Sequence, residues 1–305
     1  MSDRMLVVPE SIRDHVLIAS VSGGKDSTAM MLALREAGIE HRCVFADTGW
    51  EADETYAYLA YLVDKLGIWI DRVEAKQVGK KPPGGMVERA RYRAGFPMRS
   101  ARWCTGELKI EPIRDYHAAH SERSAVVVGL RAQESAKRAS LPELTSELEG
   151  PHSFGWPVWR PLISWSLEDV LAIHRRHGVK INPLYRRGHN RVGCYPCVYS
   201  VKGEIRLIAK HAPERIEEIR TLETEFSELR RTRNIEKPGR YGHERASFFS
   251  SRGAESRAGA GAAVGIDEVV AWSRTSRGGR QLPLIEPPPE GGCYRWGLCE
   301  AEHDS

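Results

Sequence analysis

A short apolar run that breaks into a glycine-rich turn, and then resumes with helical spacing, most constrains how this chain can fold. Residues 16–21 are mostly apolar with no polar alternation, which is typical of a strand buried on both faces of a parallel sheet. Residues 22–27 read Ser-Gly-Gly-Lys-Asp-Ser, and a helical pattern then continues over residues 27–37 to a stop at Gly38. Glycines let backbone approach a ligand closely, and the unpaired N–H groups of a first helical turn favour an anion. The run therefore predicts strand, phosphate-binding turn and helix, with an ordinary glycine-rich turn as the alternative.

Further strands and helices alternate after this turn. A second apolar run ends in Asp47-Thr48-Gly49, helical spacing covers residues 53–66, and residues 68–74 resemble a third strand. A strand at residues 125–128 runs into Arg131, whose alternative role is a structural pair with Glu134. The alternation predicts an α/β fold, a parallel sheet with helices on both faces, whose ligands lie at the carboxyl ends of the strands.

The sequence suggests three successive parts. Residues 1–200 form the predicted nucleotide-binding domain, including a helix over 167–177 that starts with a capping box at Ser166. Residues 201–249 are a helical C-terminal extension, with helices over 204–212 and 213–233. Residues 250–305 comprise a flexible segment at 250–265, which has too little apolar bulk to pack, a short helix at 267–272 and a cysteine-containing tail.

Charge and hydropathy limit the partners. The net charge is +4, but arginines gather in two clusters: Arg91, Arg93, Arg99 and Arg102, then Arg186, Arg187 and Arg191. Such clusters suit phosphate-rich ligands, from nucleotides to nucleic acid, although solvated surface arginines are the alternative. No stretch approaches the roughly 20 apolar residues that span a bilayer, and the N-terminus lacks a signal-peptide layout, so we expect a cytoplasmic protein without a membrane partner.

Residues 76–103 contain Lys80-Lys81-Pro82-Pro83-Gly84-Gly85 and then an arginine-rich stretch, which we interpret as a mobile loop able to close over phosphates. Cys104 follows just before a helix that carries Lys109, a setting that stabilises a thiolate.

The chain has six cysteines, and in the reducing cytosol we expect them to be metal ligands, reactive thiols or buried small residues rather than a disulfide framework. Cys194 and Cys197 form a Cys-x-x-Cys pair for which Cys104 is the natural third partner, and three thiolates fit an iron–sulfur cluster with one iron lacking a cysteine. Zinc and a free or disulfide-exchanging pair are the alternatives. Cys43 lies inside a predicted strand and is interpreted as a buried core residue. Cys293 and Cys299 could supply a fourth ligand, a mobile thiol, or nothing.

The residues of several motifs, taken in order, resemble one family. The turn at 22–27 is similar to the signature of PP-loop ATP pyrophosphatases, or adenine nucleotide α-hydrolases, and the whole set over about residues 15–210 resembles phosphoadenosine phosphosulfate reductase-like proteins. That set comprises residues 22–27, Asp47-Thr-Gly49, Arg102-Trp-Cys-Thr105 with Lys109, Gly129-Leu-Arg131 with Glu134-Ser135, residues 161–170, Asn182-Pro-Leu-Tyr185 and Gly193-Cys194-Tyr-Pro-Cys197.

Departures from the reductases refine the resemblance. Sulfonucleotide reductases generally lack the intact Gly-Gly-Lys-Asp-Ser, which this chain keeps, and they end in Glu-Cys-Gly-Leu-His, whereas the nearest string here is Gly297-Leu-Cys299-Glu. Cluster-bearing reductases have adjacent cysteines where this chain has Cys104-Thr105. The pattern looks closer to the ATP pyrophosphatase of DNA phosphorothioation systems and to cluster-dependent tRNA thiolases, which implies a 4Fe-4S cluster on Cys104, Cys194 and Cys197.

The resemblance implies an ATP-dependent adenylating sulfurtransferase. Lys25, Asp26 and Arg131 are the expected catalytic residues, as ATP and Mg²⁺ bind and an acceptor oxygen displaces pyrophosphate. ATP would bind Ser22, Gly23, Gly24, Lys25, Asp26, Ser27, Asp47, Thr48, Gly49 and Arg131. The expected acceptor is nucleic acid, DNA or tRNA, and the expected sulfur donor is a cysteine desulfurase; a homo-oligomer is possible. The rivals are a sulfonucleotide reductase and a non-catalytic nucleotide-binding subunit of a defence complex.

Overall fold

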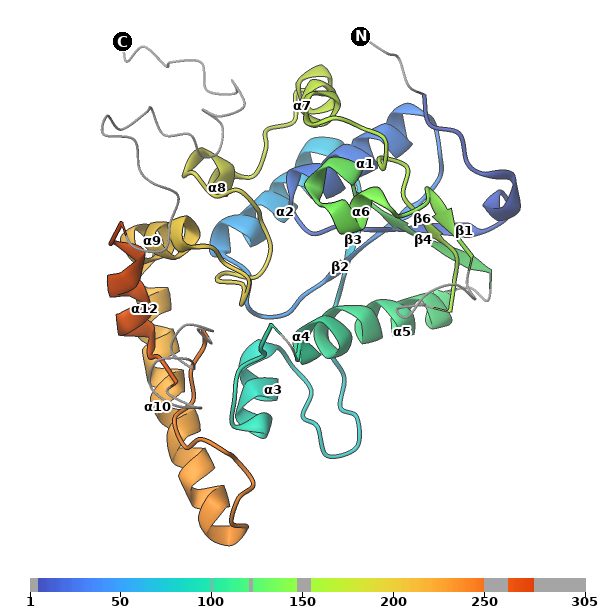
Figure 1. Ribbon diagram of the computed structural model, residues 1–305. Coiled ribbons are helices and arrows are strands. Elements are labelled where there is room, and N and C mark those ends of the chain that lie inside the picture. The colour runs from blue at the N-terminus through green and yellow to red at the C-terminus, as the bar shows by residue number, and fades with distance from the viewer. Residues whose placement is uncertain (1–4, 100, 121–122, 147–154, 250–262, 277–305) are drawn as a thin grey trace. The chain divides into compact units, whose positions relative to one another are not determined.

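The computed structural model describes residues 5–99, 101–120, 123–146, 155–249 and 263–276 (Figure 1). The chain divides into two compact units that are not contiguous in sequence. Unit 1 comprises Met1–Ala75, Glu107–Leu184 and Arg191–Gly193, and unit 2 comprises Lys76–Gly106, Tyr185–Asn190 and Cys194–Ser305. The predicted flexible segment 250–265 lies mostly outside the described residues, and Cys293 and Cys299 lie wholly outside them.

The elements that belong to unit 1 or begin at its edge are η1 (Glu10–Ile12), β1 (Val16–Ser20), α1 (Lys25–Glu36), β2 (Arg42–Ala46), α2 (Asp53–Leu66), β3 (Ile70–Val73), the π-helical turn η2 (Gly106–Ile110), α5 (Glu111–His120), β4 (Ser124–Val128), η3 (Ala132–Glu134), α6 (Ala136–Ala139), β5 (Leu144–Thr145), β6 (Val158–Trp159) and α7 (Leu167–Arg176). The remaining elements are α3 (Met86–Arg93), α4 (Trp103–Thr105), α8 (Pro183–Arg186), α9 (Lys202–His211), α10 (Pro213–Glu236) and α12 (Ile266–Ser273).

The sheet of unit 1 has the strand order β3-β2-β1-β4-β6-β5. Neighbouring strands are parallel except β5, which pairs antiparallel to β6. The chain moves from β1 through β2 to β3 on one side and then returns to place β4 on the other side of β1. Open α/β sheets bind ligands outside the carboxyl ends of the strands at such a reversal. The predicted α/β fold with a mainly parallel sheet is therefore confirmed, and the reversal of its strand order lies between β1 and β4.

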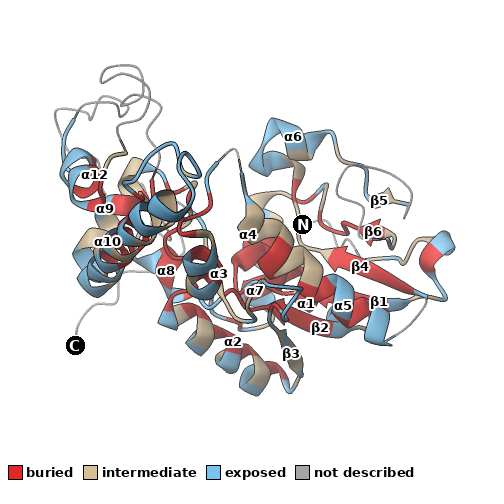
Figure 2. Ribbon diagram, turned by 90° about the horizontal axis from the view of Figure 1, so that it is seen from below, coloured by how far each residue is buried: buried red, intermediate tan, exposed pale blue. Residues whose placement is uncertain are grey.

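Helices cover both faces of this sheet, as Figure 1 shows with α1, α2 and α7 on one side and α5 on the other. Side chains alternate along a strand, so Leu17 and Ala19 pack with the α1, α2 and α7 helices, whereas Ile18 packs with α5. Most of β2 and β4 is accordingly buried (Figure 2). Cys43, which is 4% exposed, belongs to this core, which confirms its interpretation as a buried cysteine.

Local capping explains where the helices begin. Ser166 and Asp169 form the predicted capping box of α7: the Ser166 hydroxyl accepts the Asp169 N–H at 3.1 Å, and Asp169 accepts the Ser166 N–H at 2.8 Å. Helix α1 begins at Lys25, two residues earlier than the spacing predicts, with Gly24 as its N-cap. Lys25 and Asp26 are therefore part of the first helical turn.

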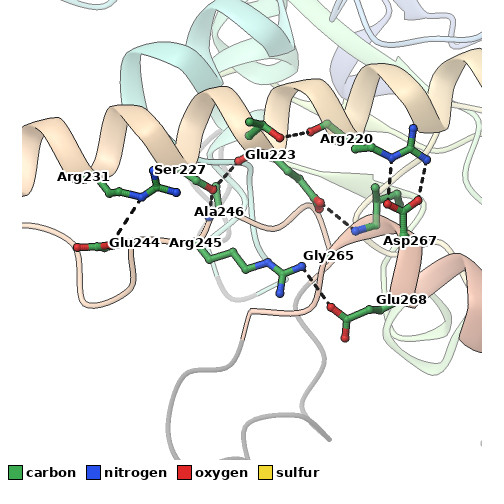
Figure 3. Close-up of a pocket in the computed structure, with 12 residues that line it drawn as sticks. Arg220, Glu223, Ser227, Arg231, Glu244, Arg245, Ala246, Gly265, Asp267 and Glu268 are labelled. Carbon is green, nitrogen blue, oxygen red and sulfur yellow. Dashed lines mark hydrogen bonds and ion pairs between the residues drawn. The ribbon is translucent and has the colours of Figure 1, made fainter.

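Unit 2 contains the predicted helices of the C-terminal extension, α9 and α10, and the short α12. Glu223 of α10 accepts the backbone N–H groups of Phe248 and Ile266, each at 2.9 Å, beside a polar pocket of about 430 Å³ (Figure 3). Burial raises the pKa of Glu223 despite these hydrogen bonds. This carboxyl group fixes two later segments onto α10.

One predicted loop is wrong in part. Residues 86–93 of the expected mobile segment form α3, because Glu88 caps its N-terminus through the Gly85 N–H at 2.9 Å, and Met86 and Ala90 are buried. Within the described residues, no helix has the length and apolar character needed to cross a membrane.

Candidate functional site

The turn after β1 is closed by its two serines. The Ser27 hydroxyl donates to the Gly24 carbonyl at 3.0 Å and accepts the Ser22 N–H at 3.2 Å, and the two serine hydroxyls lie 3.1 Å apart. Gly23 has φ of +71°, and a Cβ there would lie 2.9 Å from a methyl carbon of Thr55, so only glycine fits. The backbone of this turn is therefore fixed before any ligand binds.

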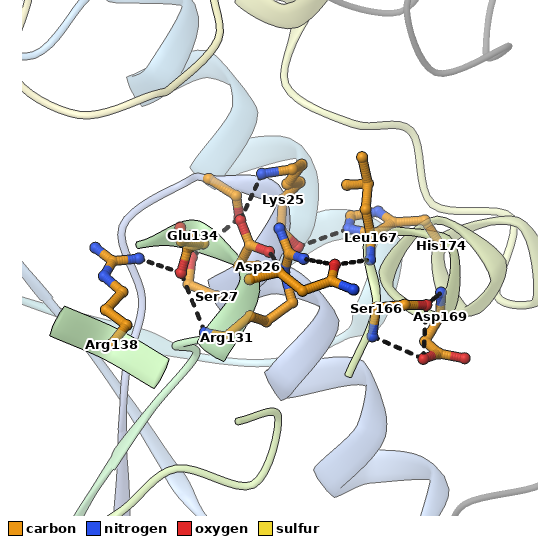
Figure 4. Close-up of polar contacts among 12 residues, drawn as sticks. Lys25, Asp26, Ser27, Arg131, Glu134, Arg138, Ser166, Leu167, Asp169 and His174 are labelled. Atoms are coloured by element: carbon orange, nitrogen blue, oxygen red, sulfur yellow. Dashed lines mark hydrogen bonds and ion pairs between the residues drawn. The ribbon is translucent and has the colours of Figure 1, made fainter. Parts of the chain in front are cut away.

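Asp26 joins the two cations predicted to contact phosphate. Lys25 Nζ lies 2.6 Å from one carboxylate oxygen of Asp26, and Arg131 Nε lies 2.5 Å from the other (Figure 4). The three residues are 5 to 9% exposed. Burial disfavours the carboxylate, but the charges of Lys25 and Arg131 outweigh it and hold the pKa of Asp26 below its ordinary value. The structure thus brings the three predicted catalytic residues together as one buried, ionised cluster.

Gly129 allows this cluster to form. It lies immediately after β4, where a Cβ would be 2.6 Å from the carbonyl oxygen of Asp26 and 2.9 Å from Cα of Ser27. Such contacts are far inside normal van der Waals separation, so a side chain at Gly129 would displace the start of α1. The absence of one lets the end of β4 deliver Arg131 directly to Asp26.

Three residues outside the predicted site, Gln133, Leu167 and His174, hold Arg131 and the start of α1. Leu167 and His174 belong to α7. The Gln133 side-chain oxygen accepts Arg131 Nη1 and the Leu167 backbone N–H, each at 3.2 Å. His174, also on α7 and 2% exposed, has Nε2 2.9 Å from the Lys25 carbonyl oxygen (Figure 4). Burial lowers the pKa of His174 against the opposing effect of its carbonyl neighbours. These contacts fix the orientation of Arg131 and the start of α1.

The turn after β2 is held from within by two buried carboxylates. Asp47 accepts the Gly49 N–H at 2.7 Å and the Tyr56 hydroxyl at 2.8 Å. Glu51, which is 2% exposed, accepts the Thr48 N–H at 3.2 Å and the Thr48 hydroxyl at 2.8 Å. The side chains of Asp47 and Thr48 are thus engaged inside the protein, and among the three predicted residues Gly49 is exposed. Binding of ATP by Asp47, Thr48 and Gly49 stays a prediction, and the exposed backbone at Gly49 would be the part that contacts ATP.

Glu51 also links this turn to a more distant segment. Lys109 Nζ, on the π-helical turn η2, lies 4.0 Å from Glu51 Oε1. Short π-helical turns are frequent at functional sites. Glu51 has no recognisable sequence signal beyond an acid near the end of a strand.

Asn182 holds the turn at residues 22–27 through its side chain. Its side-chain amide, fully buried, donates to the Gly23 carbonyl at 3.2 Å and lies 3.4 Å from the Thr55 hydroxyl. The motif around Asn182 was visible in the sequence, but its role in holding Gly23 was not.

The three candidate cluster cysteines all belong to unit 2, and contacts join their segments. Arg99 Nε donates to the Val198 carbonyl at 3.1 Å, and the guanidinium groups of Arg99 and Arg102 each lie 5.5 Å from the centre of the Tyr199 ring. Cys104, Cys194 and Cys197 are each partly exposed. No group of three or more histidine, cysteine, aspartate or glutamate side chains converges to metal-binding distance in the parts of the chain that the structure describes. As arranged, these thiols do not form a metal centre.

Comparison with known proteins identifies a family over most of the chain. The model of the phosphoadenosine phosphosulfate reductase domain matches residues 16–200. An uncharacterised 37.8 kDa protein in the gpa 5′ region of Escherichia phage 186 is 33% identical over 88% of this chain and 91% of its own length. Adenosine 5′-phosphosulfate reductase of Allochromatium vinosum is 29% identical over 62% of this chain and 70% of its own length. The crystal structure of a phosphoadenylyl-sulfate reductase from Candida auris has a TM-score of 0.48 and 18% identity, covering 61% of this chain and 84% of its own.

Proposed function

Because the chain belongs to the phosphoadenosine phosphosulfate reductase domain family, we propose that unit 1 is an ATP pyrophosphatase that transfers AMP to an acceptor. The observation that carries this proposal is the intact turn at residues 22–27, whose Lys25 and Arg131 meet on Asp26 at the reversal of the sheet. An enzyme that receives an already activated sulfate needs no such turn for cleaving ATP.

The buried cluster of Lys25, Asp26 and Arg131 explains how the polyphosphate of ATP would bind. Lys25 and Arg131 are two buried cations whose combined charge is only half balanced by the one carboxylate of Asp26. A phosphate group of ATP offers the same charge-assisted hydrogen bonds and can replace Asp26 as the partner of these cations. The N-terminal turn of α1 adds backbone N–H groups and the positive end of its dipole.

The reaction then proceeds by displacement at the α-phosphorus. An oxygen of the acceptor forms a bond to the α-phosphorus, the bond to the oxygen bridging to the β-phosphorus breaks, and pyrophosphate leaves with that electron pair. Lys25 and Arg131 stabilise the negative charge that develops on the leaving oxygen. His174, Gln133 and Asn182 keep these groups in place, so little reorganisation is needed as the charge develops.

Magnesium fits this arrangement through one protein ligand. Mg²⁺ usually binds phosphate oxygens and water with one or two carboxylates, so it does not need a group of three protein side chains. Asp26, released from Lys25 and Arg131 by the incoming phosphates, would be the carboxylate ligand. The ion supplies further charge neutralisation on the phosphates.

We further propose that the activated acceptor is nucleic acid, DNA or tRNA. Sulfide, released from the persulfide of a cysteine desulfurase by an external thiol reductant, then forms a bond to the activated atom, and AMP leaves with the former oxygen of the acceptor. The basic residues of unit 2 support a phosphate-rich acceptor. A 4Fe-4S cluster on Cys104, Cys194 and Cys197 stays a prediction, and we derive no step through it because these thiols are not assembled as a metal centre.

The second candidate is a sulfonucleotide reductase. It is favoured by the similarity to adenosine 5′-phosphosulfate reductases, among them the Allochromatium vinosum protein. Lys25 and Arg131 would then bind the phosphosulfate rather than the polyphosphate. Such an enzyme turns over without ATP.

Pyrophosphate release from ATP separates the candidates. We would assay anaerobically purified wild type, Lys25→Met and, as a control, Lys65→Met, whose lysine is exposed on α2. The proposal expects release in wild type and Lys65→Met and its loss in Lys25→Met, with DNA and tRNA tested as acceptors. Reduction of adenosine 5′-phosphosulfate with no release of pyrophosphate would establish the second candidate instead. Binding of ATP without either reaction would indicate the non-catalytic subunit.

A further inference from the structure

Unit 2 contains a buried arginine, Arg89, for which the described residues provide no counter-ion. Arg89 of α3 is 1% exposed, and Nη2 donates to the Lys76 carbonyl at 2.8 Å. Neither Nε nor Nη1 has a hydrogen-bond partner among the residues that the structure describes. A guanidinium carries five N–H donors, so most of the donor capacity of Arg89 is unused.

The surrounding segment offers no acid to pair with it. Residues 76–106 contain three lysines and five arginines but one acidic residue, Glu88. Glu88 is already the N-terminal cap of α3, since it accepts the Gly85 N–H at 2.9 Å. The charge of Arg89 is therefore surrounded by further positive charge along the chain.

Arg91, two residues further along α3, is paired with a carboxylate. Arg91 Nε and Nη2 donate to the two carboxylate oxygens of Glu225 at 2.5 and 3.1 Å, in an exposed position. Within the described parts of the chain, the exposed arginine of this helix thus has a carboxylate partner and the buried one has none.

Arg89 is also held where it is. The carbonyl groups at the end of α3 are capped by the C-terminal half of α10: Arg233 donates to the Tyr92 carbonyl at 2.8 Å, and Arg230 donates to the Ala94 carbonyl at 2.6 Å. These contacts restrain α3, which limits how far the Arg89 side chain can move toward water.

Burial of an unpaired charge is costly, and such groups are normally paired with an ion of opposite sign. We propose that Arg89 is an anion-binding residue whose ligand is a phosphate- or sulfate-type oxyanion. An oxyanion accepts charge-assisted hydrogen bonds from a guanidinium, and the unpartnered Nε and Nη1 leave donors on both edges of the Arg89 group for such a ligand. Because Arg89 lies in unit 2, this proposal does not rest on the adenylation proposed for unit 1.

The first test measures thermal unfolding during titration with inorganic phosphate and, separately, with sulfate. Lys25→Met serves as the background, since it weakens phosphate binding at the turn of unit 1. We expect the melting temperature of Lys25→Met to rise with anion concentration. Adding Arg89→Met should abolish that rise, whereas adding the matched change Arg91→Met should leave it. An equal rise with and without Arg89, or no rise in Lys25→Met itself, would overturn the proposal.

A second test uses stability and needs no ligand. In buffer free of phosphate and sulfate, Arg89→Met removes an unpaired buried charge while keeping most of the buried volume. Its melting temperature should therefore exceed that of wild type. A lower melting temperature would mean that the guanidinium itself stabilises the fold, which contradicts the proposal.

Arg89→Lys covers the case in which the methionine variant does not fold. Lysine keeps the positive charge but loses the planar set of five donors, so the affinity for phosphate, from the anion titration in the Lys25→Met background, should fall about tenfold. Unchanged affinity in this variant would also overturn the proposal.

Discussion

Replacing Asp26 with asparagine is the most severe test of the buried cluster that Lys25, Asp26 and Arg131 form. Asp26 is 9% exposed and contacts Lys25 Nζ at 2.6 Å and Arg131 Nε at 2.5 Å. A hydrogen bond to a charged group contributes about 1.5–3 kcal/mol, and the variant weakens two of them. Asparagine can still accept from one cation, so we expect the free energy of unfolding to fall by about 3–5 kcal/mol, the usual loss when one partner of a buried ion pair is removed.

Urea unfolding at pH 7 measures this loss. Asp64→Asn is the matched control, because Asp64 is exposed on α2, and it should change the free energy of unfolding by less than about 0.5 kcal/mol. A loss for Asp26→Asn as small as that of the control would refute the reasoning, since the cluster would then contribute nothing to the stability of the turn.

The same variant has a defined pH dependence. The pKa of Asp26 in the folded protein lies below its ordinary value of 3.8, so its stabilising effect is complete above that pH and is lost as the pH falls toward the folded pKa. The difference between wild type and Asp26→Asn should therefore be constant from pH 7 to about 5 and shrink below about pH 4. If the difference instead shrank between pH 7 and 5, a titratable group other than Asp26 would be responsible for the pH dependence.

Three further changes test other parts of the account. Gly129→Ala places a Cβ 2.6 Å from the Asp26 carbonyl oxygen, so the free energy of unfolding in urea should fall by about 1–3 kcal/mol and pyrophosphate release should fall. In the control Gly203→Ala the added Cβ would have no atom within 4 Å, so neither loss should occur. Gln133→Ala releases Arg131 Nη1, so calorimetry should show weaker ATP binding with a stability loss near 1 kcal/mol, and unchanged affinity would contradict its positioning role. Burial lowers the pKa of His117 to about 4, so wild-type stability should fall by up to about 3 kcal/mol between pH 6.5 and 4, and His117→Gln should show a smaller fall.

The fold was largely predictable because its signals are local. An apolar run without alternation, as at residues 16–21, and a glycine stop such as Gly38 act within a few residues of the chain. Ser166 and Asp169 lie three residues apart, so their capping box is visible in the sequence. Helix α3 was missed because Pro82, Pro83 and two glycines precede it, and its support comes from α10, more than a hundred residues later.

The site was predictable where residues carry a motif and not where they act at a distance. The turn at residues 22–27 and Arg131 could be proposed as anion contacts, but their meeting on Asp26 required the strand order that puts β4 beside β1. Gln133, His174 and Asn182 each make a hydrogen bond to a residue 34 to 159 positions away, and no local pattern in the sequence indicates such a contact. Arg89 was one arginine among many until its burial and unused donors were known.

The most direct measurement of the central claim is which bond of ATP the protein cleaves. Phosphorus NMR of the products formed with Mg²⁺ and an acceptor nucleic acid distinguishes AMP and pyrophosphate from ADP and phosphate. We expect AMP, free or joined to the acceptor, and one pyrophosphate for each ATP consumed, and neither from Lys25→Met. Formation of ADP and phosphate, or intact ATP in a sample that reduces adenosine 5′-phosphosulfate, would contradict the claim.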